Sequence, residues 1–250
     1  YEVSTSRIAV AAGAIRASGL PPRSFGLYAQ EVIGERTVFA LNAEQPYTMA
    51  STTKIVTSLA ALDLLGPYYR WRTSAFALGT LAQGKLVGDL LIVGGGNAQL
   101  TSAELQAWFS RMHAQGLEEI QGDIVLDRFA FNLNDDDHAN TPLPTPYHPG
   151  YARPDALMLD EGVLRVALHA GPKRSTQVRL LPGQSDLAVV NRLTAGGGCS
   201  ATAQLEEANL SSRLVVRGTW GAACGDREIA QLALSHVELT QGAVAELWRD

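Results

Sequence analysis

A serine and a lysine three residues apart, Ser51 and Lys54, are the residues whose types and spacing best suit covalent catalysis. In an α-helix, side chains three positions apart lie on one face, so the lysine amine can reach the serine hydroxyl. That hydroxyl is a poor nucleophile until a base removes its proton, and a lysine amine accepts a proton only where burial or nearby cations favour its neutral form. The pair therefore predicts acyl transfer by Ser51, with a desolvated Lys54 as the base.

A helix must position the two side chains, and the sequence after Ser51 predicts one. Apolar residues recur there at helical intervals, and Gly66-Pro67 ends the run. Ser51 is a favoured N-cap residue, so we expect it at the helix N-terminus, where free N–H groups and the helix dipole favour an oxyanion. The alternative is a plain helix cap followed by a solvated lysine, because a lone Ser-x-x-Lys match is a weak signal.

Several other segments extend the pattern around the serine. They are residues 42–54, Gly88-Asp89-Leu90, Gly94-Gly95-Gly96-Asn97, residues 122–127 and Val237-Glu238-Leu239. Together they resemble the penicillin-binding D-alanyl-D-alanine carboxypeptidases of type 4, the S13 peptidase family, over nearly the whole chain. The resemblance implies that Ser51 is the acylated nucleophile and Lys54 the general base. Met49 stands where the family usually has proline, which should alter the approach to the helix and not the chemistry.

The resemblance also implies a substrate and an inhibitor class. The substrate would be the D-Ala-D-Ala end of a peptidoglycan stem peptide or cross-link, and β-lactam antibiotics would acylate the same serine. In related enzymes an aspartate at the position of Asp127 points toward the substrate, where it could pair with the free amine of a diaminopimelate side chain. The alternative for Asp127 is a strand-end carboxylate in a turn or a surface ion pair.

Two further motifs of the family, Ser-x-Asn and Lys-Thr-Gly or His-Thr-Gly, do not occur in these 250 residues. A complete catalytic site therefore cannot be assembled from this sequence. We expect an N-terminal part of a longer protein, whose C-terminal half supplies the missing groups. The alternatives are a related β-lactamase or esterase, and a non-catalytic pseudoenzyme that binds the cell wall.

Composition restricts the partners and the compartment. The formal net charge of −5 argues against nucleic acid or an anionic membrane as the main partner. No apolar run approaches the roughly 20 residues of a transmembrane helix. The resemblance implies a periplasmic or extracytoplasmic protein whose signal peptide has already been removed. For Cys199 and Cys224, free thiols and a disulfide both remain open on sequence alone, and the compartment implied by the family favours the disulfide.

No cofactor or metal is expected. Gly94-Gly95-Gly96 follows a predicted strand, but it lacks the spacing of a nucleotide-binding loop and is better explained as a tight turn. Asp135-Asp136-Asp137-His138 lacks the frame of a known metal site, so a solvated loop is the simpler interpretation.

Hydrophobic periodicity predicts a mixed α/β chain in three parts. We expect the incomplete start of a transpeptidase-like, β-lactamase-type catalytic domain at residues 1–74, with a helix at 7–18 and strands at 26–32 and 37–43. A second α+β domain should comprise residues 75–152 and 226–250, with strands at 85–93 and 122–127, and helices at 101–115 and 242–249. An inserted antiparallel β domain should occupy residues 153–225, after a proline-rich loop at 132–154.

Overall fold

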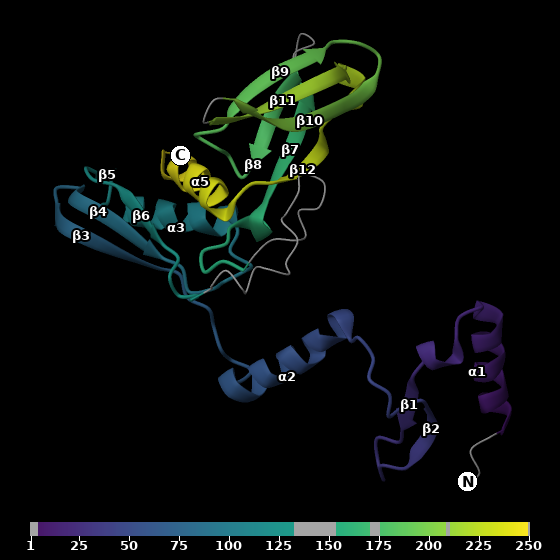
Figure 1. Cartoon of the computed structure of the whole chain (residues 1–250). Helices are drawn as coiled ribbons and strands as arrows, with labels where there is room; N and C mark the ends of the chain where they lie inside the picture. Colours follow the sequence, from purple (N-terminus) through teal and green to yellow (C-terminus); the bar gives the residue numbers. More distant parts are fainter. Residues whose placement is uncertain (1–4, 133–153, 171–175, 209–210, 250) are drawn as a thin grey trace. The chain divides into compact units, whose positions relative to one another are not determined.

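The computed structural model describes residues 5–132, 154–170, 176–208 and 211–249. The chain forms two compact units, Tyr1–Tyr69 and Arg70–Asp250 (Figure 1). The proline-rich loop expected at 132–154, with its acidic cluster at Asp135 to His138, lies almost entirely outside the described residues. The overall expectation of a mixed α/β chain with several sheets is confirmed.

The first unit contains a helix, a β-hairpin and a second helix, in the predicted order. Its elements are α1 (Thr5–Ser18), β1 (Leu27–Gln30), β2 (Thr37–Leu41) and α2 (Thr53–Leu65). The two strands pair antiparallel, with Leu27 opposite Leu41. One boundary differs from the prediction, because α2 begins at Thr53 and a 3-10 turn, Ala50–Thr52, contains Ser51. Ser51 is therefore one residue ahead of the N-cap, which is Thr52 and makes no side-chain capping bond.

The second unit begins with a sheet centred on one strand. Its strands are β3 (Ser74–Ala82), β4 (Lys85–Val93), β5 (Glu119–Ile120) and β6 (Ile124–Asp127). β3 pairs antiparallel with β4, and the short strands β5 and β6 both pair parallel with β4 on its other side. β4 alternates between buried and partly exposed residues from Leu86 onward, as expected for a strand with one face on the core.

Two helices pack beside this sheet around a shared core. They are α3 (Ser102–Ala114) and α5 (His236–Arg249). Thr101 and Glu104 form a capping box at the start of α3, which begins one residue after the predicted start of this helix. Ile92 of β4, Phe109 of α3 and Val244 of α5 belong to one buried cluster, and the rings of Phe109 and Trp248 meet edge to face at 5.3 Å. Residues far apart in the sequence thus complete one α+β core.

Two further three-stranded sheets share a second core (Figure 1). One has the order β12-β7-β8 and the other β10-β11-β9. Their strands are β7 (Val163–Ala170), β8 (Thr176–Leu181), β9 (Ala188–Thr194), β10 (Cys199–Ala208), β11 (Ser211–Trp220) and β12 (Arg227–Ala233). Val166 and Leu164 of one sheet and Leu214, Val216 and Trp220 of the other are buried together.

One detail of this region differs from the sequence prediction, because the expected antiparallel β domain contains one parallel pair, β9 with β11. β12 pairs with β7, so residues 227–233 form a sheet with residues 163–170, from the other side of the boundary predicted at 226. Alternation with a period of two identifies a strand, but it does not specify the strand's partner or direction.

Candidate active site

Ser51 and Lys54 are in direct contact. The Lys54 Nζ atom donates a hydrogen bond to the Ser51 Oγ atom at 2.9 Å. The serine belongs to the 3-10 turn and the lysine to the first turn of α2. The spacing of three residues produces this contact locally, because both side chains fall on the same side of one helical turn.

The backbone immediately before Ser51 adopts an uncommon conformation. Ala50 has a φ of 46°, in the left-handed region that residues with a Cβ atom normally avoid at a cost of about 1–2 kcal/mol. The Thr53 Oγ1 atom donates a hydrogen bond to the Ala50 carbonyl at 2.7 Å, which holds this turn in place. Such conformations cluster at functional sites, so Ala50 singles out the turn that presents Ser51.

The expected desolvation of Lys54 is not found. Ser51 and Lys54 are both exposed, and no residue of α2 is buried. The apolar residues of α2 that predicted a packed helix are exposed as well, with Ile55 at 68%, Leu59 at 67% and Leu62 at 56%. The reason is that the described residues of the first unit offer no surface that covers α2. Lys54 therefore contacts Ser51 but lacks the burial that a lysine base requires.

Asp127 lies at the end of β6 in the second unit, opposite Val93 of β4. Its Oδ1 atom accepts a hydrogen bond from the Phe129 N–H group at 2.9 Å, and its carbonyl accepts one from Gly94. The carboxylate thus closes a turn after the strand, which is the simpler of the two roles considered for it. Its second carboxylate oxygen forms no hydrogen bond with any residue that the structure describes, and the side chain is half-buried.

Gly94-Gly95-Gly96 packs against protein at close range. A Cβ atom on Gly95 would lie 2.2 Å from the Arg72 carbonyl oxygen, and one on Gly94 would lie 2.4 Å from that of Ala156. The N–H groups of Gly94 and Gly96 donate to carbonyl oxygens of the protein. The glycines therefore serve close backbone packing, and the turn that the sequence predicted at these residues comes after them, at residues 98–99.

An ion pair next to Asp127 was missed by the sequence reasoning. Arg128 and Asp155 pair through both carboxylate oxygens, and Asp155 is 8% exposed. Burial lowers the pKa of Arg128 from its ordinary value. Asp155 comes just before the apolar run at residues 156–159. A charged residue next to a buried segment needs a partner, so this position could have indicated the ion pair.

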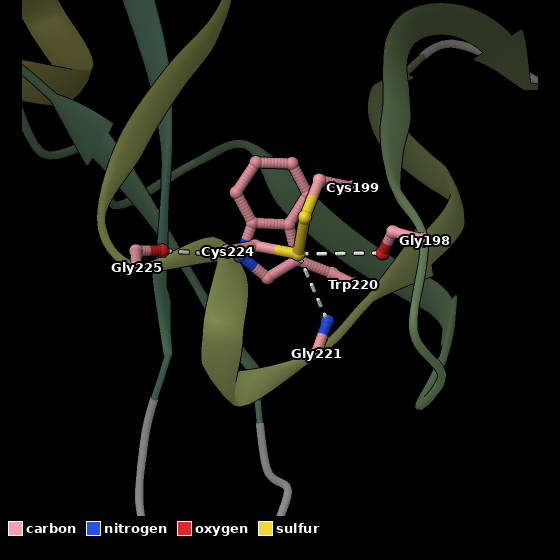
Figure 2. The surroundings of a disulfide bond; sticks show 6 residues. All are labelled: Gly198, Cys199, Trp220, Gly221, Cys224 and Gly225. Carbon is pink, nitrogen blue, oxygen red and sulfur yellow. Dashed lines mark hydrogen bonds between the residues drawn. A yellow bond between two sulfur atoms is a disulfide. The ribbon is translucent and has the colours of Figure 1, made fainter.

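Cys199 and Cys224 are joined by a disulfide, with their Cα atoms 5.5 Å apart (Figure 2). The bond links the start of β10 to the 3-10 turn Ala222–Cys224 that follows β11. Beside it, the Trp220 indole N–H donates to the Gly225 carbonyl at 3.2 Å. The disulfide thereby fixes one edge of the second core, where Trp220 is buried.

The described part of the chain contains neither a metal-binding cluster nor a membrane-spanning helix. Among those residues, no three His, Cys, Asp or Glu side chains gather as a metal site would require. No helix within the described ranges combines the length and the apolarity needed to cross a membrane.

The fold is similar to solved structures of a penicillin-binding protein. The crystal structure of penicillin binding protein 4 (dacB) from Haemophilus influenzae superposes with a TM-score of 0.62 and 20% identity, covering 90% of this chain and 50% of that one. A complex of the same protein with a β-lactam superposes with a TM-score of 0.56 and 19% identity, covering 90% of this chain and 48% of that one.

Curated relatives are similar over shorter stretches. D-alanyl-D-alanine carboxypeptidase DacB of Haemophilus influenzae is 28% identical over 110 residues, which is 44% of this chain and 23% of the relative. The D-alanyl-D-alanine carboxypeptidase of Actinomadura sp. (strain R39) is 32% identical over 78 residues, which is 31% of this chain and 14% of the relative. The matches thus cover at most half of these proteins.

A family model matches almost the whole chain. It describes the D-Ala-D-Ala carboxypeptidase 3 (S13) family and aligns with residues 8–246. The chain therefore belongs to the D-Ala-D-Ala carboxypeptidase 3 (S13) family.

Proposed function

We propose that this chain carries the nucleophile of a serine-type D-Ala-D-Ala carboxypeptidase and endopeptidase that acts on peptidoglycan stem peptides. The observation that carries the proposal is the 2.9 Å contact between Lys54 Nζ and Ser51 Oγ in a member of the S13 family. The type of nucleophile, the type of base and their spacing all suit acyl transfer. The periplasm or another extracytoplasmic compartment, where peptidoglycan lies, is part of the same proposal.

In the proposed reaction, the Ser51 hydroxyl attacks the carbonyl carbon of the penultimate D-alanine. The neutral Lys54 amine takes the hydroxyl proton, and the peptide C–N bond breaks as the leaving amine receives a proton. Terminal D-alanine leaves in the carboxypeptidase reaction, and the amine of a neighbouring stem peptide leaves in the endopeptidase reaction. Water then hydrolyses the ester on Ser51. A β-lactam would react at the same serine and stay attached, because its opened ring cannot depart.

The reaction requires groups that this chain does not contain. A Ser-x-Asn serine and a Lys-Thr-Gly strand are absent from the sequence, and Lys54 is exposed in the first unit. We propose that a further polypeptide segment supplies these groups and covers the apolar face of α2. The exposed leucines and isoleucine of α2 support this, because an amphipathic helix gains its stability by burying such a face. Covering that face would also desolvate Lys54 and favour its neutral form.

Asp127 has a proposed role in binding. One carboxylate oxygen closes the turn at Phe129, and the other carries negative charge that could receive the free amine of a diaminopimelate side chain. The role would be electrostatic and would not involve the reacting bond.

Adduct mapping tests the proposed nucleophile. The protein, as the cell produces it, is incubated with a labelled penicillin, digested and examined by mass spectrometry. We expect one labelled peptide, with the label on Ser51, and none in the Ser51→Ala variant. Absence of an adduct, or an adduct on another serine, would overturn the assignment. Fast release of the label would instead identify a β-lactamase or esterase.

A second candidate is a non-catalytic protein that binds the cell wall. The exposure of Lys54 favours it, since a lysine that acts as a base requires burial or nearby cations. Binding to peptidoglycan without any penicillin adduct would establish this alternative.

A further inference from the structure

The sheet β10-β11-β9 has one face that packs on the core and one that does not. Leu214, Val216 and Trp220 of β11 are buried in the second core. The alternate residues of β11, namely Arg213, Val215, Arg217 and Thr219, therefore lie on the opposite face. The register extends this face over the neighbouring strands, with Ser200, Thr202, Gln204 and Glu206 of β10 and Ala188, Val190, Arg192 and Thr194 of β9. We call these twelve residues the arginine face.

Glu206 holds two of the three arginines on this face. Its Oε2 atom accepts hydrogen bonds from Arg213 Nη2 at 2.8 Å and Nε at 3.2 Å, and its Oε1 atom accepts one from Arg217 Nη2 at 2.6 Å. The two arginine side chains remain about two-fifths exposed, at 42% and 43%. The shared carboxylate orients both guanidinium groups and still leaves donor groups of each free, since a guanidinium carries five N–H donors.

Arg192, unlike Arg213 and Arg217, is not paired with a carboxylate of the described residues. It lies in register with Arg217 on the adjacent strand and is exposed, and its side chain forms no hydrogen bond or ion pair with any residue that the structure describes. Two like charges at neighbouring positions of a sheet destabilise it slightly unless another group compensates them. The pair therefore suggests a ligand with negative charge.

The charge of the arginine face contrasts with that of the chain. Three arginines and one glutamate give its strand residues two excess positive charges, whereas the whole chain has a net charge of −5. A local positive field on an acidic protein attracts anions to this face and not to the surface in general. Val215 at its centre is 1% exposed and flanked by Arg213 and Arg217, whose aliphatic stems can cover an apolar neighbour.

The side chains around the arginines can bind polar groups of a polymer. Thr194, Ser200, Thr202 and Gln204 are exposed on the same face and offer hydroxyl and amide groups. Guanidinium groups bind carboxylates through paired hydrogen bonds, and hydroxyl and amide groups suit the hydroxyl groups of a sugar chain.

We propose that the arginine face is a second, non-catalytic binding site for the carboxylate groups of peptidoglycan strands. This inference rests on the proposed function, which names peptidoglycan as the substrate. Arg192 and Arg217 bind one carboxylate between them, and Glu206 competes with this ligand for donor groups of Arg217. The site would hold the enzyme on its polymeric substrate while the chemistry occurs elsewhere.

Co-sedimentation with insoluble peptidoglycan tests the site, with the Ser51→Ala chain used throughout so that no acyl-enzyme contributes. Arg192→Gln should weaken binding about two- to fivefold at low salt, the effect of losing one exposed charge contact. Arg111→Gln is the matched control, because it removes one exposed arginine from α3 and should leave binding unchanged. Equal binding by the two variants would overturn the proposal.

Glu206→Gln supplies a test of opposite sign. This change frees Arg213 and Arg217 from their shared carboxylate and removes the one negative charge of the face, so binding should strengthen by about the same factor. Weaker binding by this variant would contradict the proposed geometry. Arg192→Gln should retain the unfolding midpoint of the parent chain, which a merely structural role for Arg192 would not predict.

Chemical modification of the polymer identifies the ligand group. Peptidoglycan whose carboxylates have been converted to amides should bind the chain at the level of Arg192→Gln, and 0.3 M salt should have a similar effect. Unchanged binding to the amidated polymer, or stronger binding to a phosphate polymer, would reject carboxylates as the ligand. These binding measurements do not depend on Ser51. The arginine face can therefore fail to bind peptidoglycan while penicillin still labels Ser51, and it can bind peptidoglycan when penicillin does not label Ser51.

Discussion

Arg128 and Asp155 form an ion pair that joins the end of β6 to the segment before β7, across 27 positions of the sequence. Asp155 also accepts a hydrogen bond from the Leu157 N–H group at 2.8 Å, so one buried carboxylate fixes two chain segments. Ala156, Leu157 and Leu159 follow it and are buried beside the sheet. The pair thus anchors the segment against which Gly94 and Gly96 pack.

Asp155→Asn should destabilise the second unit. The change leaves the partly buried Arg128 without a counter-charge, and removing one member of such a pair costs about 2–4 kcal/mol. Urea unfolding followed by tryptophan fluorescence measures the effect. All four tryptophans, Trp71, Trp108, Trp220 and Trp248, belong to the second unit, so the signal reports on that unit.

The matched control for this change is Glu119→Gln, which breaks an exposed pair with Lys85 in the same unit. Its unfolding midpoint should stay close to that of the parent chain, because exposed ion pairs contribute little to stability. Equal midpoints for Asp155→Asn and the control would show that the buried pair does not anchor the segment.

The bond between Cys199 and Cys224 can be tested by thiol counting. Under denaturing, non-reducing conditions we expect no reactive thiol, and one thiol per cysteine after reduction. The bond closes a loop with a sequence separation of 25, for which chain entropy predicts a stabilisation of about 3 kcal/mol. Reduction should therefore lower the unfolding midpoint of the parent chain. The double variant with serine at both positions should start lower and should not respond to reductant.

We expect the contribution of Glu206 to the free energy of unfolding to depend on pH. Hydrogen bonds from Arg217 and then from Arg213 hold the pKa of its carboxyl below the ordinary value of 4.5. A lowered folded-state pKa means that this stabilisation is fully present above pH 4.5 and is lost as the pH falls through the folded-state pKa. The difference in unfolding midpoint between the parent chain and Glu206→Gln should therefore shrink as the pH falls below 4.5. A difference that grew on acidification would have the wrong sign.

Most secondary structure could be predicted from the sequence because the apolar pattern is local. The strand at residues 85–93 matches the predicted bounds, and α3 begins one residue after the predicted start at 101. β3 was not identified, since its apolar residues do not alternate clearly with polar ones. The pairing of β12 with β7 and the parallel pair β9–β11 could not be predicted, because strand partners depend on contacts between distant segments.

One part of the candidate site could likewise be predicted from the sequence, and another part could not. A spacing of three residues predicted the contact between Lys54 and Ser51, because one helical turn produces it. The environment of that contact could not be predicted, because burial depends on what packs against α2 from elsewhere. The sequence also does not indicate the positive φ of Ala50, since alanine rarely adopts this conformation. The boundaries proposed at residues 74, 152 and 226 remain predictions, and the compact units divide after Tyr69.

Lys54→Ala should separate catalysis from folding. The lysine is exposed and no residue of α2 is buried, so the variant should unfold at the same urea concentration as the parent chain. Loss of the general base should slow labelling by penicillin about 10²- to 10⁴-fold. Lys85→Ala is the control, because it removes an exposed lysine of β4 and should label at the parental rate. Parental labelling by Lys54→Ala would assign the base to another group.

Asp127→Asn should weaken the turnover of stem peptides that carry a free amine and spare acylation by penicillin. The amide retains an oxygen that can accept the Phe129 N–H bond, so the turn is preserved while the charge is removed. Loss of one exposed charge pair lowers kcat/KM about two- to fivefold. The measurement compares a peptide with a free side-chain amine and the same peptide with that amine acetylated.

The control for Asp127→Asn is Asp123→Asn, which removes an exposed carboxylate from the turn just before the same strand. A general loss of negative charge would affect both variants and both peptides alike. A specific contact would lower kcat/KM only for Asp127→Asn and only with the free amine, because acetylation removes the positive charge that the carboxylate attracts. If the two variants behave alike, the Asp127 carboxylate acts through the turn at Phe129 and has no direct role in binding.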